Sequence, residues 1–211
     1  ARFAGTEPIH FAGSGLRLPR RDGTPATPAD LTDIEQRLDL WSGTLVSRFR
    51  VDGSQVQVTS AAHPERDLLA VRIEASGMPA GRLAIAFAFP YGSPTHTGDP
   101  PDWTRPEAHT TAITRAAQGE IAWARTLDAD GYHVRAAWQG GGALEQAGTH
   151  EFILTPEGGQ LDRREQQPVV RREEIVNLAR AFVSKGVCRD HLHVRPTISV
   201  VTCQILPGTC I

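Results

Sequence analysis

The chain has 211 residues, of which 40% are hydrophobic and 22% are charged, a composition typical of a globular protein with a buried core. Its formal net charge of −2 provides no electrostatic basis for a nucleic acid or an anionic membrane as partner, and we expect neither. The chain contains no apolar run of about 18 residues, so the sequence predicts no membrane-spanning helix.

Short apolar runs alternate with turn signals from Ile9 to about Thr155, a pattern typical of an all-β sandwich or barrel. Asp52 and Gly53 separate two such runs and predict a tight hairpin turn between them. Pro28–Leu31 is expected to form a helical turn or a loop, with Thr27 as a candidate cap. The main runs that predict strands are 16–18, 34–40, 44–51, 55–59, 68–73, 82–89, 109–117, 121–127, 132–139 and 150–154.

Large apolar residues alternate with alanines along Arg82–Phe89. Small residues on one face of a strand favour close packing of another layer, so this strand is expected to be buried on both faces, between stacked sheets. Three tryptophans, Trp41, Trp123 and Trp138, lie in or next to predicted strands and are expected to belong to the core. The predicted fold class is therefore mainly β, an antiparallel β-sandwich formed by residues 1–160.

The sequence changes character after Pro156. Within a charged segment, Ile175, Leu178, Ala179 and Phe182 recur at helical spacing and predict an amphipathic helix over Arg172–Ser184. We therefore expect a linker helix within residues 161–186, followed by an irregular tail over 187–211.

All three cysteines, Cys188, Cys203 and Cys210, lie in the last 24 residues. Two interpretations are open: a zinc site that includes His191 or His193, or incidental thiols in a poorly ordered tail. Since the segment lacks a paired C-x-x-C knuckle, the second is preferred, and neither a metal nor a cofactor is expected. The odd number leaves the redox state of the three thiols, and the cellular compartment, undetermined.

The proline-rich loop 91–109 is the best candidate site. Trp103 could stack on a sugar ring while Asp102 and Arg105 bind its hydroxyls; a loop that packs against a neighbouring domain would have a similar composition. Asp99 and Glu107 could span the distance between two glycosidase carboxyls, but no catalytic residue is assigned. The chain contains no G-x-S-x-G, P-loop or H-E-x-x-H motif. The candidate carbohydrate-contact residues are His96, Asp99, Asp102, Trp103, Arg105, Glu107 and His109.

Several stretches resemble the amino-terminal β-sandwich of large glycosidases of glycoside hydrolase families 65 and 95. They include IHFAGSGLRL, DGTPATPADLTDIEQRLDLWSGTLVSRFRVDG, AAHPERDLLAVRIEAS, AIAFAFPYGS, LDADGYHVRAAW and EFILTP, and together they span about residues 9–156. The resemblance implies a supersandwich-like fold followed by an (α/α)6 barrel that holds the catalytic carboxylates. Beyond Gly186 the sequence departs from this pattern.

The expected function is that of a non-catalytic sandwich domain, as a fragment of a glycoside hydrolase. It would be inactive alone, with the parent protein's (α/α)6 catalytic barrel as partner and carbohydrate as a further candidate partner. Two alternatives remain open. The first is a small stand-alone carbohydrate-binding or glycoside-hydrolysing protein that uses the 91–109 loop, and the second is a binding module stabilised by a metal or disulfides in its cysteine-containing tail.

Overall fold

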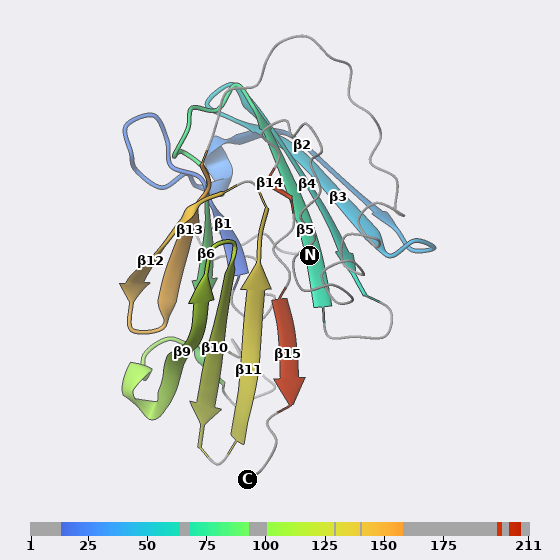
Figure 1. Ribbon diagram of the computed structural model, residues 1–211. Coiled ribbons are helices and arrows are strands. Elements are labelled where there is room, and N and C mark those ends of the chain that lie inside the picture. The colour runs from blue at the N-terminus through green and yellow to red at the C-terminus, as the bar shows by residue number, and fades with distance from the viewer. Residues whose placement is uncertain are drawn as a thin grey trace.

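The computed structural model describes residues 14–63, 68–92, 101–128, 130–139, 141–157, 198–199 and 203–207. In this part of the chain the protein is mainly β and its strands are antiparallel, as the sequence predicts (Figure 1). The helical residues described are two 3-10 turns, η1 (Pro28–Asp30) and η2 (Pro106–Ala108). None of the helices described could cross a membrane. The predicted linker helix lies outside the described residues.

A large sheet of nine strands forms the first layer. From one edge to the other it runs β2-β3-β4-β5-β15-β11-β10-β9, with β14 beside β5. The bounds are β2 Leu31–Asp39, β3 Thr44–Val51, β4 Ser54–Ala62, β5 Leu68–Ser76, β9 His109–Ala117, β10 Glu120–Leu127, β11 Asp130–Ala137, β14 Ile198–Ser199 and β15 Cys203–Pro207.

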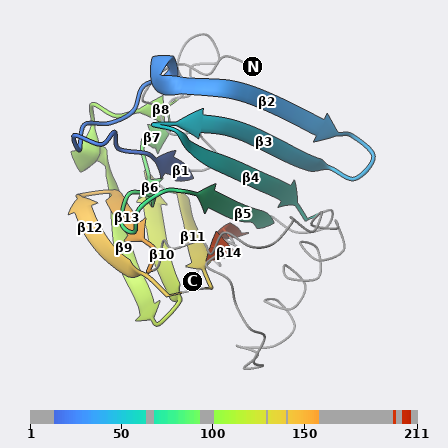
Figure 2. The same ribbon diagram turned by 90° about the horizontal axis from the view of Figure 1, so that it is seen from above.

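A smaller sheet of four strands forms the second layer, in the order β1-β6-β13-β12. A two-residue ladder between β7 and β8 closes the loop that follows β6. Seen from above, β2 to β4 extend away from the small sheet (Figure 2). The bounds are β1 Ser14–Arg17, β6 Ala84–Ala88, β7 Tyr91–Gly92, β8 Pro101–Asp102, β12 Ala143–Gly148 and β13 Glu151–Thr155.

Trp123 on β10 lies at the centre of the core between the two sheets, with no exposed surface. Its ring is 5.3 Å from that of Phe87 on β6 and 5.2 Å from that of Phe152 on β13, measured between centroids. The two sheets therefore pack face to face, as in a sandwich. Trp138 is buried as predicted, and β6 is buried on both faces, since Ala86 and Ala88 are buried as well as Ile85 and Phe87.

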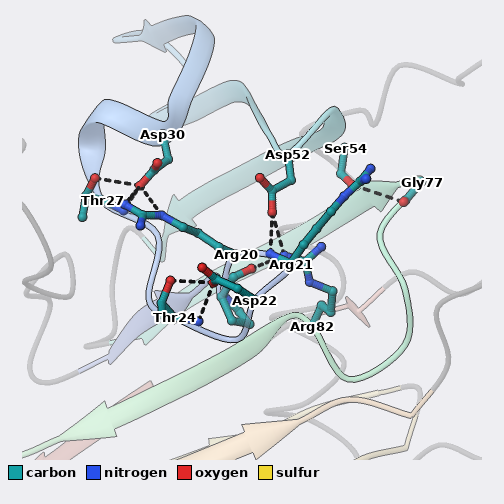
Figure 3. Close-up of polar contacts among 11 residues, drawn as sticks. Arg20, Arg21, Asp22, Thr24, Thr27, Asp30, Asp52, Ser54, Gly77 and Arg82 are labelled. Carbon is teal, nitrogen blue, oxygen red and sulfur yellow. Dashed lines mark hydrogen bonds and ion pairs between the residues drawn. The ribbon is translucent and has the colours of Figure 1, made fainter.

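The turn between β3 and β4 has the conformation that the Asp-Gly pair predicts. Asp52 has φ +48° and Gly53 has φ +79°, so both occupy the left-handed region that two-residue hairpins use. The Asp52 carboxylate accepts hydrogen bonds from the Arg21 backbone N–H at 2.8 Å and from the Arg82 guanidinium at 2.9 Å (Figure 3). The turn is thereby fixed to the two loops that lead into η1 and β6.

A second set of contacts in the same region holds η1 in place. The Asp30 carboxylate accepts from the Thr27 backbone N–H at 2.6 Å, and Arg20 donates to it at 2.7 Å (Figure 3). These hydrogen bonds lower the pKa of Asp30 to about 2, with the Arg20 contact as the largest cause. Thr27 therefore belongs to a capping arrangement, as the sequence predicts.

Trp41 corrects one prediction, because it is 93% exposed and not part of the core. It lies in the turn between β2 and β3, and Figure 2 shows this end of the hairpin directed away from the small sheet, which therefore does not cover it. Strand β12 follows the glycine triplet, where the sequence suggests only a loop. Within 187–211, assigned to an irregular tail, the structure has β14 and β15, which pair with β5 and β11.

Candidate functional site

The loop between β8 and β9 carries five of the seven candidate residues. Asp102 ends β8, Trp103 and Arg105 lie between β8 and η2, Glu107 lies in η2, and His109 begins β9. His96 and Asp99 lie outside the described residues. The structure brings Asp102, Arg105 and His109 around Tyr91, whereas Trp103 and Glu107 are exposed.

Asp102 is occupied by contacts within its own loop. Its carboxylate accepts from the Thr104 backbone N–H at 2.9 Å, from Thr104 Oγ1 at 2.7 Å and from Arg105 Nε at 2.7 Å. The hydrogen bonds from Thr104, followed by that from Arg105, lower the pKa of Asp102 to about 2. Asp102 is therefore an ionised turn-stabilising group and unsuited to act as a general acid near neutral pH.

Arg105 and Asp128 fix Tyr91 from two directions. The Arg105 guanidinium carbon lies 4.4 Å from the centre of the Tyr91 ring and covers one of its faces. The Tyr91 hydroxyl donates to Asp128 Oδ2 at 2.7 Å, and this hydrogen bond is the main cause that raises the pKa of Tyr91. Because Asp128 lies in the turn after β10, these contacts attach the loop to the large sheet.

Beside Tyr91, the His109 and His150 rings stack with centroids 3.9 Å apart. His150 Nε2 lies 2.7 Å from the Pro106 carbonyl, which can only accept, so Nε2 carries the hydrogen. Its Nδ1 lies 2.7 Å from Thr111 Oγ1. A hydroxyl beside an imidazole is also the arrangement of a nucleophile and its general base. Here both ring nitrogens of His150 are held by structural partners, so we interpret the pair as structural.

The residues around Tyr91 form a polar cluster that includes His109, Asp128 and His150. Arg125 on β10 lies at its centre and is only 1% exposed. One guanidinium nitrogen contacts His109 Nδ1 at 2.8 Å, the Thr110 carbonyl at 2.9 Å and Thr111 Oγ1 at 2.5 Å. A second nitrogen, Nη2, donates to the Pro90 carbonyl at 3.2 Å. No carboxylate pairs with Arg125 within the residues that the structure describes, so neutral acceptors compensate for its desolvation.

Burial is the first cause that lowers the pKa of His109, to about 4, and the charges of Arg125 and His150 are the next. A buried cation at 2.8 Å favours the imidazole that accepts a hydrogen bond over the imidazolium. His109 is therefore neutral at pH 7 and serves as an acceptor for Arg125.

Sequence reasoning missed Tyr91, Arg125, Asp128 and His150 as members of this cluster. Arg125 has a signal in the sequence, because it lies two residues after Trp123 in the run IAWARTL and so shares the inward face of the strand. His150 has none, because its contact with His109 joins residues 41 positions apart in the chain.

The described residues contain no cluster of three or more His, Cys, Asp or Glu side chains placed to hold a metal ion. Of the three cysteines, Cys188 and Cys210 lie outside the described residues, and Cys203 belongs to β15. The cluster as a whole is a set of hydrogen bonds, ion pairs and ring contacts that fixes the shape of the 101–109 loop.

No family model matches this chain, and a search of curated proteins likewise finds no match.

Proposed function

We propose that this chain is a non-catalytic β-sandwich that packs against the (α/α)6 catalytic barrel of a glycoside hydrolase and shapes its active site. The observation that carries the proposal is the internal hydrogen bonding of the 101–109 loop. Asp102, Arg105, His109 and His150 all have partners within the chain, so the loop is fixed without the help of a ligand.

A loop of this kind suits a surface that another domain packs against. Trp103 is 42% exposed on it, and Ile113 on the neighbouring edge strand β9 is also exposed. Tryptophan is among the residues that contribute most to protein interfaces. Because internal contacts already order the loop, docking would cost little additional conformational entropy.

The test is to mix the chain with an (α/α)6 barrel from family 65 or 95 that lacks its own sandwich. We expect a complex in analytical ultracentrifugation and faster glycoside hydrolysis than by the barrel alone. Trp103→Ala is expected to weaken the complex, whereas Trp41→Ala, a matched truncation at the far end of the β2–β3 hairpin, is expected to leave it intact. If no complex forms with barrels of either family, the proposal is wrong.

The alternative is a stand-alone carbohydrate-binding or glycoside-hydrolysing protein, favoured by the exposed indole of Trp103 close to Arg105 in the same loop. Titration with α-linked disaccharides, α-fucosides and α-rhamnosides, followed by tryptophan fluorescence, would reveal binding. A response that Trp103→Ala abolishes would support the binding function. Hydrolysis without any barrel, lost in Asp102→Ala, would support the enzyme.

A further inference from the structure

Strand β2 is an edge of the large sheet in the part of the chain that the structure describes. Among the described residues its backbone pairs only with β3, and Figure 2 shows it as the outermost strand on that side. The unpaired backbone groups along its other side are able to accept a further strand. The edge is long, since β2 has nine residues.

The edge also carries the most exposed large apolar residues described. Ile34 and Leu38 on β2 are more than half exposed, Leu40 is 84% exposed and Trp41 is 93% exposed. Single exposed apolar residues are ordinary, but four within eight consecutive positions are an unusual concentration. This concentration indicates a surface that another protein covers.

The sequence of β2 identifies the partner, because it is complementary to itself when it is read in the opposite direction. Around Gln36, the neighbours Glu35 and Arg37 have opposite charges, and the next pair, Ile34 and Leu38, are both apolar. We propose that β2 pairs antiparallel with β2 of a second copy of this chain, about a two-fold axis at Gln36. Each Glu35 then lies opposite an Arg37, and each Ile34 opposite a Leu38.

The neighbouring registers are worse electrostatically. A pairing centred on Glu35 places the two Glu35 carboxylates opposite each other, and one centred on Arg37 does the same with the two guanidinium groups. Like charges directly opposite each other in a ladder are destabilising, whereas opposite charges and apolar pairs stabilise it. Registers that keep the same faces of the two sheets aligned differ from one another by a shift of two residues. The nearest such alternatives are the pairings centred on Glu35 and on Arg37, so the Gln36-centred register is favoured.

Contacts within each copy are compatible with this pairing. Arg37 makes no hydrogen bond or ion pair with another described residue, although its charge contributes to lowering the pKa of Asp39, so its guanidinium can pair with a second copy. Glu35 contacts Arg48 at 3.5 Å but remains 63% exposed. The one unfavourable pair is Asp33 opposite Asp39. Its repulsion is reduced within each copy, because Asp33 contacts Arg50 at 3.3 Å and Asp39 accepts hydrogen bonds in the β2–β3 turn.

The β-bulge at the start of β2 limits the extent of pairing. Two residues of β2, Asp33 and Ile34, oppose one residue of β3, and Asp33 has φ +51°. The regular part of the ladder is therefore the short stretch Glu35–Arg37 around the axis, with Ile34 opposite Leu38 at each of its ends. The Leu40–Trp41 turn would lie beside the first residues of the other β2. An isologous pairing uses the same edge in both copies, so it forms a dimer and does not extend into a fibre through β2.

Reversal of the two charges provides the test. In sedimentation velocity at graded concentrations, the full chain is expected to dimerise, and both Arg37→Glu and Glu35→Arg are expected to raise the dissociation constant at least about tenfold through like-charge pairs. Equimolar mixing of the two variants is expected to restore dimers, since both pairs between positions 35 and 37 then join opposite charges. The matched control, Arg115→Glu on the opposite edge strand β9, is expected to dimerise like the unmodified chain.

Cross-linking tests the register itself. The two-fold axis places Gln36 opposite its own copy, within the distance that a disulfide spans, so Gln36→Cys is expected to form a 36–36 disulfide on mild oxidation. Ile34→Cys opposes Leu38 of the other copy and is expected not to form a 34–34 disulfide. Peptide mapping distinguishes both products from links through the native cysteines.

A chain that stays monomeric at all accessible concentrations, or charge variants that do not recover on mixing, would overturn the proposal. Dimers that are indifferent to both charge reversals would do the same, because they would use another surface. The dimer is independent of the proposed barrel partner, which uses the 101–109 loop, and Trp103→Ala is therefore expected to leave dimerisation unchanged.

Discussion

The His109 and His150 rings stack with an interplanar angle of 29°, although the two residues come from different sheets of the sandwich, His109 from β9 and His150 from the turn before β13. Hydrogen bonds continue from this stack to Arg125 on one side and to Pro106 on the other. The contact therefore links the candidate loop, the large sheet and the small sheet, and it couples the protonation of His109 to the stability of the fold.

Stability is expected to fall as the pH is lowered from about 6.5 to about 4. The pKa of His109 is lowered from 6.5 to about 4, by burial and then by the charges of Arg125 and His150, against a smaller opposing effect of Glu107. Between these values the unfolded chain binds a proton that the folded chain does not, so acidification favours unfolding. The expected slope from this group is at most about 1.4 kcal/mol per pH unit.

Urea denaturation at a series of pH values measures this slope. His109→Gln is expected to flatten it, because a neutral amide cannot take up the proton. A matched change at the exposed His133 on β11, His133→Gln, keeps His109 and is expected to retain the slope. An unchanged slope in His109→Gln would show that other groups determine the acid stability.

Arg125→Met is expected to destabilise the protein by roughly 3 kcal/mol, because it leaves one buried and several part-buried acceptors without a donor. These include His109 Nδ1 and the Thr110 and Pro90 carbonyls. Arg125→Lys is expected to recover only part of the loss, since a single ammonium group cannot reach acceptors on both sides of the guanidinium. Arg115→Met, at an exposed position on β9, provides the control, and chemical denaturation provides the measurement. Equal effects of Arg125→Met and Arg115→Met would contradict this role.

The core and the hairpins follow from local sequence, whereas the polar cluster does not. Alternation along β6 and β10 predicts burial of Phe87 and Trp123, and the Asp52-Gly53 pair predicts its turn, because these signals depend on residues close in the chain. The stack of His109 on His150 depends on how two sheets meet, which strand periodicity does not encode. The prediction for Trp41 was wrong because the hydrophobicity of a side chain favours its burial but does not determine whether the side chain is buried within one chain or at an interface.

Two substitutions of Trp123 separate the free energy lost with its packing from the effect of its indole N–H group. Its indole Nε1 is buried without a hydrogen-bond partner among the described residues. Trp123→Ala is expected to cost about 3–5 kcal/mol, because it opens a cavity between Phe87, Phe89 and Phe152. Trp123→Phe is expected to cost less than half as much, since it keeps an aromatic ring and removes the unpaired donor. Similar free energies of unfolding for the two variants would indicate that the Nε1–H group has a stabilising partner.

The β3–β4 turn is expected to depend on its aspartate in two separable ways. Asp52→Asn keeps a residue that tolerates the left-handed conformation at φ +48° but weakens the contact with Arg82. Asp52→Ala loses both the conformational tolerance and every side-chain hydrogen bond. The melting temperature is therefore expected to decrease in the order unmodified chain, Asp52→Asn, Asp52→Ala, as measured by thermal unfolding. Arg82→Met is expected to make the two Asp52 variants more alike, because it removes the donor of the weakened hydrogen bond that Asn keeps and Ala lacks. If Asp52→Ala were as stable as Asp52→Asn in the unmodified background, neither the tolerance of Asn for the left-handed conformation nor the hydrogen bonds that Asn retains would contribute to stability.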